Sequence, residues 1–268
     1  MSDLRRVTIR DLQAVKDRGE RFAMLTAYDE PSARLLEEAG ISVLLVGDTV
    51  GDNVLGHPNT VAVDLETMLH HTRAVVRGSG RALVVADLPF GAYGISVEQG
   101  LRSAVRLVQD GGAGAVKAEG AGPVVELAER AVRLGIPFMG HLGLMPQSVH
   151  QTGYRVQGRG EAAEVRLLDD ALRLEDAGAF AVVLEAVPAE VARAVTERLS
   201  VPTIGIGAGP DTVGQVLVLH DLLGLAVGEP PRFARRYADL SSAVVEAVTA
   251  YREDVEHGRF PSSEHTYR

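Results

Sequence analysis

Short apolar runs alternate with longer amphipathic segments along most of the chain. The short runs are rich in Val, Ile, Leu and Ala, lack a helical period, and end at Gly or a polar residue, which is typical of buried parallel strands. Eight strands are predicted in this way, over residues 22–27, 43–47, 82–86, 115–118, 136–140, 180–184, 202–206 and 222–226.

The segments between these runs repeat apolar residues at helical spacing and carry helix boundary signals. Ser96 caps one such segment with Glu98 in its first turn, and Gly40 ends another. After a first helix that Thr8 caps, helices are predicted over residues 31–39, 63–76, 96–109, 123–134, 162–177, 188–199 and 213–218, with a terminal amphipathic helix over 232–251.

Eight alternations of strand and helix predict a (β/α)8 TIM barrel, with one helix preceding the first strand. No break in composition interrupts residues 1–268, so we expect a single domain followed by a polar tail from about 252. An open doubly wound sheet is the alternative fold, but it would leave the last units unexplained. The long connection over residues 142–160 is expected to be an active-site loop or lid.

Composition narrows the class of protein. The net charge of −9 disfavours a general nucleic-acid surface, and the absence of Cys excludes thiolate nucleophiles, disulfides and Cys-bound zinc. The first residues lack the apolar segment of a signal peptide, and no apolar run approaches the ~20 residues of a membrane span. We therefore expect a cytoplasmic protein that binds neither nucleic acid nor membranes.

Polar residues stand at the same position of five consecutive strands, directly after or at the end of each apolar run. They are Asp48, Asp87, Glu119, His141 and Glu185. One such acid could simply cap a loop or helix. Four acids and a His in register indicate instead a shared site, because all of these positions face the C-terminal rim of a barrel, where catalytic groups of this fold lie.

Clustered carboxylates repel one another, so the pattern favours a bound cation. Oxygen ligands without Cys favour Mg²⁺ or a similar hard ion over zinc. Lys117 precedes Glu119 by two residues and is expected on the same side of its strand, as an anchor for a substrate carboxylate or enolate oxygen, or alternatively as a structural ion pair. Glu185 is the preferred candidate for a base held off the metal.

Other residues are weaker candidates. Asp52 could compete with Asp48 for the metal, and His57 and His150 could touch a ligand from mouth loops. The glycine-rich segment 205–209 resembles a phosphate loop but lacks the spacing of a dinucleotide fingerprint, and tight strand-to-helix packing explains it equally well.

Nine segments spread over nearly the whole chain carry a resemblance to a known family. They are RFAMLTAYD, VGDTVGDNVLGH, ADLPFGAY, VKAEG, GHLGLMPQSV, YRVQGRG, VLEAVP, PTIGIGAG and GRFPSSEH. With these segments the chain resembles the ketopantoate hydroxymethyltransferase family. The resemblance implies a (β/α)8 fold, in agreement with the strand count, and a homo-oligomer, commonly a decamer.

The resemblance also implies roles for individual residues. It implies that Asp48 and Asp87 bind Mg²⁺, with Glu119 as a direct or water-mediated third ligand. The 2-oxo acid would chelate the metal, with Thr49, Lys117 and His141 contacting it. The family usually has Ser at position 49, and Thr keeps the hydroxyl group.

The mechanism hypothesis joins these roles. Glu185 would remove a proton from the branched carbon of 3-methyl-2-oxobutanoate, and Mg²⁺ with Lys117 would stabilise the enolate. The enolate would attack the one-carbon unit of 5,10-methylenetetrahydrofolate to give ketopantoate, a pantothenate precursor. The alternatives are a Mg²⁺-dependent lyase of the phosphoenolpyruvate mutase or isocitrate lyase type, which the absence of Cys disfavours, and a non-catalytic barrel that serves as a scaffold or metabolite sensor.

Overall fold

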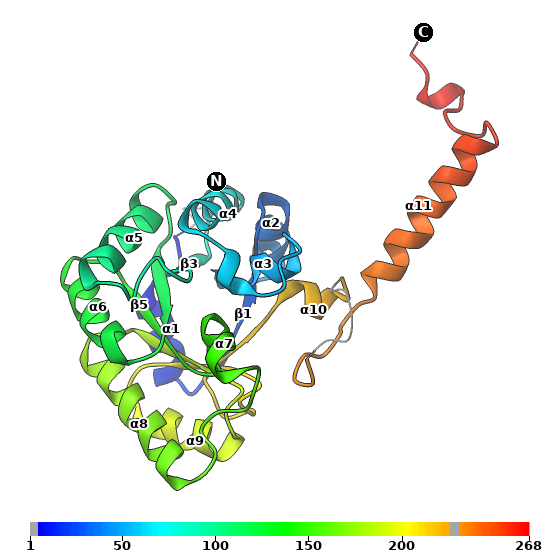
Figure 1. Ribbon diagram of the computed structural model, residues 1–268. Helices are drawn as coiled ribbons and strands as arrows, with labels where there is room; N and C mark the ends of the chain where they lie inside the picture. Colours follow the sequence, from blue (N-terminus) through cyan, green and yellow to red (C-terminus); the bar gives the residue numbers. More distant parts are fainter. Residues whose placement is uncertain (1–4, 226–230, 268) are drawn as a thin grey trace. The chain divides into compact units, whose positions relative to one another are not determined.

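The computed structural model describes residues 5–225 and 231–267, and within them eight parallel strands close into a barrel in sequence order (Figure 1). The last strand pairs with the first, with Val216 opposite Met24, which closes the barrel. The predicted (β/α)8 fold is therefore confirmed. The strands are β1 (Phe22–Thr26), β2 (Val43–Val46), β3 (Leu83–Asp87), β4 (Ala115–Glu119), β5 (Phe138–Gly143), β6 (Ala181–Glu185), β7 (Thr203–Ile206) and β8 (Gly214–Leu217).

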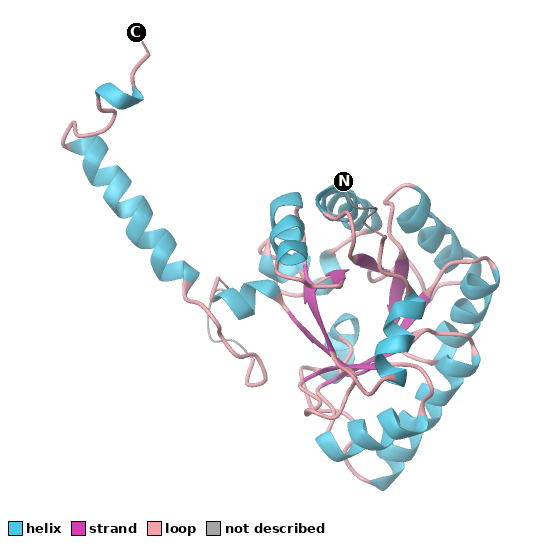
Figure 2. Cartoon of the chain, turned by 180° about the vertical axis from the view of Figure 1, so that it is seen from behind, coloured by secondary structure: helices cyan, strands magenta, loops and turns pink. Residues whose placement is uncertain are grey.

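Helices connect most of the strands, and those within residues 5–218 surround the barrel (Figure 2). Their starts follow the expected capping chemistry, since the side chains of Asp29, Asp64 and Ser96 each accept a backbone N–H of the first turn. The helices are α1 (Ile9–Asp17), α2 (Glu30–Glu38), α3 (Val50–Asn53), α4 (Leu65–Gly78), α5 (Val97–Gln109), α6 (Gly122–Arg133), α7 (Val149–Thr152), α8 (Glu161–Asp176), α9 (Ala189–Arg198), α10 (Leu219–Leu223) and α11 (Leu240–Glu256), with 3-10 turns η1 (Thr60–Ala62), η2 (Pro146–Ser148) and η3 (Ser263–His265). Among the described helices, none combines the length and apolar character needed to cross a bilayer.

The barrel interior is a packed apolar core at the beginning of the strands. Leu12 of α1 belongs to the same buried cluster as Val43, Leu83 and Ala115, the first residues of β2, β3 and β4. The helix before β1 thus closes the N-terminal end of the barrel. Full burial of a Leu or Val side chain contributes about 1.5–3 kcal/mol, so this end stabilises the fold and leaves the opposite rim for polar groups.

The prediction for the eighth strand is wrong. Residues 219–223 form α10 instead of a strand over 222–226, and residue 226 lies outside the described residues. The helix predicted over 213–218 is also wrong, because the same segment is β8, with Val216 buried and Gln215 exposed. A loop replaces the helix between β7 and β8, and backbone pairing with β1 and β7 decides the conformation of this four-residue strand.

The chain divides into two compact units, Met1–Val218 and Leu219–Arg268. The first contains the whole barrel. In the second, the terminal helix predicted from residue 232 begins only at Leu240, after Asp239, whose side chain accepts the Ser242 N–H. This helix has no buried residue in the structure. The expectation of one domain over residues 1–268 stays a prediction.

Candidate active site

One pocket at the C-terminal rim of the barrel gathers the polar residues predicted at the strand ends, together with Thr49 and Lys117. It encloses about 420 Å³, part of it open to solvent. β3, β4 and β6 each end on an acid of the site, His141 lies within β5, and Asp48 follows β2 by two residues. The predicted residues that line the pocket are Asp48, Thr49, Asp87, Lys117, Glu119, His141 and Glu185.

Strand register places the polar groups beside one another. Asp87 of β3 is the partner of Lys117 of β4, and Glu119 of β4 is the partner of His141 of β5. All four residues are buried, with exposed fractions of 3–7%. Neighbouring parallel strands lie about 5 Å apart, so residues at the same level of the rim are within reach of one another.

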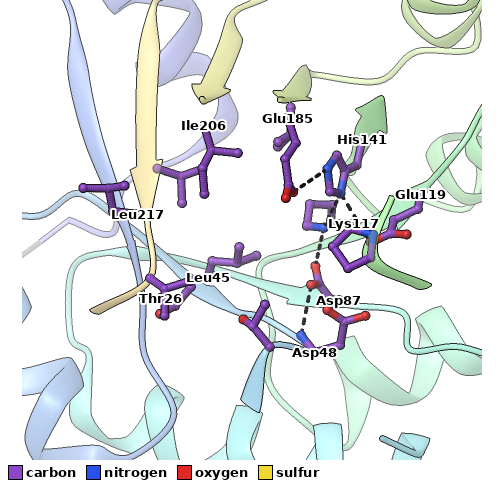
Figure 3. Close-up of a pocket in the computed structure, with 15 residues that line it drawn as sticks. Thr26, Leu45, Asp48, Asp87, Lys117, Glu119, His141, Glu185, Ile206 and Leu217 are labelled. Atoms are coloured by element: carbon purple, nitrogen blue, oxygen red, sulfur yellow. Dashed lines mark hydrogen bonds and ion pairs between the residues drawn. The ribbon is translucent and has the colours of Figure 1, made fainter. Parts of the chain in front are cut away.

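Asp48 and Asp87 form the acidic side of the pocket (Figure 3). The backbone N–H of Asp48 donates to Asp87 Oδ2 at 3.1 Å, and Asp87 Oδ1 lies 3.1 Å from Lys117 Nζ. The pKa of Asp48 is raised to about 7, chiefly by burial and then by the negative charge of Asp87, while the charge of Lys117 acts in the opposite direction. Lys117 thus offsets only part of the repulsion between these two carboxylates.

Glu119 adds a third acid to the same side. Burial, followed by the charge of Asp48, raises its pKa well above the ordinary value, and the charge of Lys117 acts in the opposite direction. Its Oε1 lies 3.6 Å from His141 Nδ1. A divalent cation among these acids would relieve their repulsion, so the donor chemistry fits a hard metal ion such as Mg²⁺.

The ligand set for that ion is not closed around one point. In the described ranges, 5–225 and 231–267, no group of three or more His, Asp or Glu side chains is arranged to hold a metal ion. Binding would thus need rotation of at least one carboxylate or oxygen atoms from substrate and water. The assignment of Asp48, Asp87 and Glu119 as ligands stays a prediction.

His141 lies between the cation and the base of the site. Lys117 Nζ is 3.1 Å from His141 Nδ1, and His141 Nε2 is 3.1 Å from Glu185 Oε2. Burial would lower the pKa of Lys117, but the charges of the neighbouring acids raise it, so its ammonium donates. Burial and the Lys117 charge lower the pKa of His141 well below its ordinary value, so we infer a neutral ring with its proton on Nε2, toward Glu185.

Glu185 is the last residue of β6 and has a side chain 14% exposed. Burial raises its pKa from 4.5 to about 7, while the charge of Lys117 lowers it. A carboxylate with a pKa near the working pH can both accept and return a proton. This environment supports the prediction that Glu185 is a base.

The opposite wall of the pocket is mainly apolar, with Thr26 as a polar residue beside Leu45 (Figure 3). Leu45 and Ile206 face the polar groups across the cavity, and Leu217 lies on the same side (Figure 3). The pocket is therefore divided into a charged half and a hydrophobic half. Such a division suits a small molecule with an anionic end and an alkyl group.

Three polar residues of the site escaped prediction from the sequence. Tyr28 is hydrogen-bonded to Thr49 through their hydroxyl oxygens at 2.7 Å, and Tyr93 donates to Gln147 Oε1 at 2.8 Å. Tyr28 follows β1 by two residues, as Asp48 follows β2, so the strand-end pattern could have pointed to it. Tyr93 and Gln147 lie further along the connections after β3 and β5, and only the family resemblance of the GAY and MPQ segments could have pointed to them. Asp52, His57 and His150 do not line the pocket.

Comparison with known proteins gives full-length matches. The model of the family described as ketopantoate hydroxymethyltransferase matches residues 6–263. This chain is also similar to proteins named 3-methyl-2-oxobutanoate hydroxymethyltransferase. The protein of Chloroflexus aurantiacus is 55% identical over 98% of this chain and 93% of the relative. The protein of Moorella thermoacetica is 53% identical over 100% of both chains.

Solved structures of lower sequence similarity share the fold. A phosphonopyruvate hydrolase in complex with oxalate and Mg²⁺ superposes with a TM-score of 0.62 at 15% identity, over 97% of this chain and 93% of that one. A 2,3-dimethylmalate lyase of the phosphoenolpyruvate mutase and isocitrate lyase superfamily superposes with a TM-score of 0.61 at 18% identity, over 97% and 92%. At these identities the likeness concerns the barrel alone.

Proposed function

The chain belongs to the ketopantoate hydroxymethyltransferase family, and on that premise we propose that it transfers a hydroxymethyl group from 5,10-methylenetetrahydrofolate to 3-methyl-2-oxobutanoate. The product is ketopantoate, the precursor of pantothenate. The observation that carries the proposal is the buried Glu185, which shares one pocket with Lys117 and a cluster of acids. This arrangement suits removal of a proton next to a keto group.

The charged half of the pocket would receive the 2-oxo acid end of the substrate. Asp48, Asp87 and Glu119 are the residues proposed to hold Mg²⁺, which when bound would polarise the keto group. Lys117 provides a buried positive charge for the substrate oxygens, and the Thr49 hydroxyl, oriented by Tyr28, provides a hydrogen-bonding group.

The apolar half would receive the branched alkyl group. Leu45, Ile206 and Leu217 offer no hydrogen-bonding side chains, so a polar or charged substituent placed there would lose its water without gaining a partner. A branched aliphatic 2-oxo acid fits this wall, whereas a dicarboxylic acid does not.

The chemistry proposed for the chain's own groups begins with proton transfer. Glu185 accepts the proton from the branched carbon, and the ammonium of Lys117 stabilises the negative charge that develops on the keto oxygen. His141 lies between the two groups, with Nδ1 3.1 Å from Lys117 Nζ and Nε2 3.1 Å from Glu185 Oε2. Water adds to the methylene carbon of 5,10-methylenetetrahydrofolate, both carbon–nitrogen bonds to that carbon break, and tetrahydrofolate leaves. The carbon nucleophile then attacks the one-carbon aldehyde that results, and the aldehyde oxygen takes up a proton to become the new hydroxyl group.

Exchange of the substrate proton with deuterated solvent tests the role of Glu185. With 3-methyl-2-oxobutanoate and Mg²⁺, the wild-type protein should exchange the proton at the branched carbon, as followed by NMR. Glu185→Gln should lower the exchange rate by about 10²-fold or more, while Mg²⁺ and substrate still bind in calorimetry. Normal exchange in this variant would remove Glu185 from the base role.

A Mg²⁺-dependent lyase of the phosphoenolpyruvate mutase or isocitrate lyase type is the second candidate. Its support is the shared barrel at 15–18% identity. Against it, the mainly apolar wall has no positively charged side chain to bind a second carboxylate or a phosphonate. Turnover of isocitrate or phosphonopyruvate without folate would favour this alternative.

A further inference from the structure

Gln147 lies at the centre of a buried hydrogen-bond network that joins two of the acids. It belongs to η2, in the long segment after β5, and is only 8% exposed. Its Nε2 donates to Asp48 Oδ2 at 2.7 Å and to the Leu88 carbonyl oxygen at 3.0 Å, and its backbone N–H donates to Glu119 Oε2 at 3.1 Å. One residue thus contacts one oxygen of each carboxylate.

Tyr93 completes this network from the loop after β3. The backbone N–H of Glu119 donates to the Tyr93 hydroxyl at 3.0 Å, and that hydroxyl donates to Gln147 Oε1 at 2.8 Å. The hydrogen bonds therefore run in one direction, from Glu119 through Tyr93 and Gln147 to the Asp48 carboxylate. With Oε1 and both Nε2 protons used, only one orientation of the Gln147 amide satisfies all its partners.

We propose that Gln147 is a positioning residue for the metal-binding acids, and that Tyr93 fixes the orientation of its amide. By engaging one oxygen of each carboxylate, Gln147 determines the direction in which the second oxygen of Asp48 and of Glu119 points. This inference rests on the proposed function, because it assumes that these acids hold Mg²⁺.

The same contacts connect the long segment to the site. Gln147 is the third residue after Leu144, at the beginning of the connection that leads to α8, and its contacts reach residues after β2, β3 and β4. Loss of the amide would leave two buried acceptors, Asp48 Oδ2 and the Leu88 carbonyl, without this donor. Groups that orient metal ligands typically change metal affinity or activity by about 10–100-fold when they are removed.

Calorimetric titration of Mg²⁺ into three variants tests the proposal. Gln147→Met removes the amide at nearly constant chain length, and Tyr93→Phe removes only the hydroxyl. Gln99→Met is the matched control, since the Gln99 amide donates to the Gly91 carbonyl at 2.8 Å and does not line the pocket. Thermal unfolding checks that each variant is folded.

Gln147→Met should weaken Mg²⁺ binding by about tenfold or more, Tyr93→Phe should weaken it in the same direction, and Gln99→Met should stay within about twofold of wild type. Mg²⁺ affinity of Gln147→Met within about twofold of wild type overturns the proposal. If Gln147→Met does not fold, Tyr93→Phe replaces it as the test, and Mg²⁺ affinity of Tyr93→Phe within about twofold of wild type then overturns the proposal.

The wild-type protein separates failure of this inference from failure of the proposed function. Suppose that wild type binds Mg²⁺ and exchanges the substrate proton. If Gln147→Met then has the same Mg²⁺ affinity and the same exchange rate, only the positioning role is wrong. If wild type binds no Mg²⁺ even with 3-methyl-2-oxobutanoate present, both the proposed function and the positioning role are wrong.

Discussion

His141 couples the positive charge of Lys117 to the base Glu185. Because the buried ring is neutral and accepts from Lys117 at Nδ1, its Nε2 proton is directed to the Glu185 side. Both neighbours are charged groups in a buried environment, where an unpaired charge is costly. The sequence predicted that His141 stands at the rim but did not predict this intermediate position, because pairwise contacts between strands depend on register.

The pH dependence of proton exchange follows from the environment of Glu185. Burial raises its pKa from 4.5 to about 7, and a bound cation would lower that value by its charge. Only the ionised form accepts a proton, so kcat/KM for exchange should be constant above the pKa and fall about tenfold per pH unit below it. With Mg²⁺ present, we expect the inflection between 4.5 and about 7.

NMR exchange rates measured across this pH range, on protein shown to remain folded, provide the check. A rate that stays constant from pH 7 down to 4.5 would contradict a base with a raised pKa.

Some residues of the site could be predicted from the sequence and others could not. The acids at strand ends could be predicted to share a rim because the ends of parallel strands meet there. The expectation that they lie in register is wrong, since Asp87 is the partner of Lys117 and Glu185 is the partner of Gly143. Gln147 and Tyr93 could not be predicted, since both lie in connections whose path has no period. Their contacts emerge only when the loops after β3 and β5 are folded over the rim.

Among the elements, β5 and β6 approach each other closely where they position the base. Gly143, the last residue of β5, is the register partner of Glu185 and has a φ of 95°. A Cβ at this position would overlap the Glu185 carbonyl oxygen and lie 2.7 Å from Val187 Cγ2. Glycine is therefore required both for the backbone conformation and for the space beside the base.

Gly143→Ala should displace the end of β6 and with it Glu185. We expect the free energy of unfolding to fall by about 2 kcal/mol or more, from the left-handed strain and the overlap together, and proton exchange to fall at least about tenfold. Gly153→Ala is the control, because Gly153 also has a positive φ, of 61°, but a Cβ there meets nothing within 4 Å.

Urea denaturation and NMR exchange measure the two effects. Equal losses of stability and exchange in both variants would show that strain alone, without displacement of Glu185, explains the result.

The eighth strand was predicted wrongly because the local sequence pattern does not decide the conformation of so short a segment. The segment 214–217 has only four residues and includes a Gly, so its apolar pattern resembles a short helix as well as a strand. Long-range pairing with β1, which is far away in sequence, determines its conformation. Strands bounded by clear helices, such as β2, β3 and β4, were predicted within one or two residues.

For the whole molecule, a bound metal ion should stabilise the barrel. A ligand at 100 times its Kd stabilises the folded state by about 2.7 kcal/mol, which corresponds to a rise in Tm of several degrees for a protein of this size. Mg²⁺ should therefore raise Tm at fixed protein concentration, and EDTA should reverse the rise. An equal rise in Asp48→Asn would place the ion elsewhere.

The decameric assembly implied by the family resemblance also belongs to this scale and stays a prediction. Native mass spectrometry would count the chains, and a stable monomer at micromolar concentration would contradict it.

The function proposed for this barrel is formation of ketopantoate from 3-methyl-2-oxobutanoate and 5,10-methylenetetrahydrofolate with the help of Mg²⁺. The most direct test is an assay of ketopantoate with and without the folate and with and without EDTA. We expect product only when both co-substrates are present, loss of activity in EDTA, and recovery when Mg²⁺ is added in excess. Absence of ketopantoate from wild-type protein with both co-substrates and Mg²⁺ would contradict the proposed function.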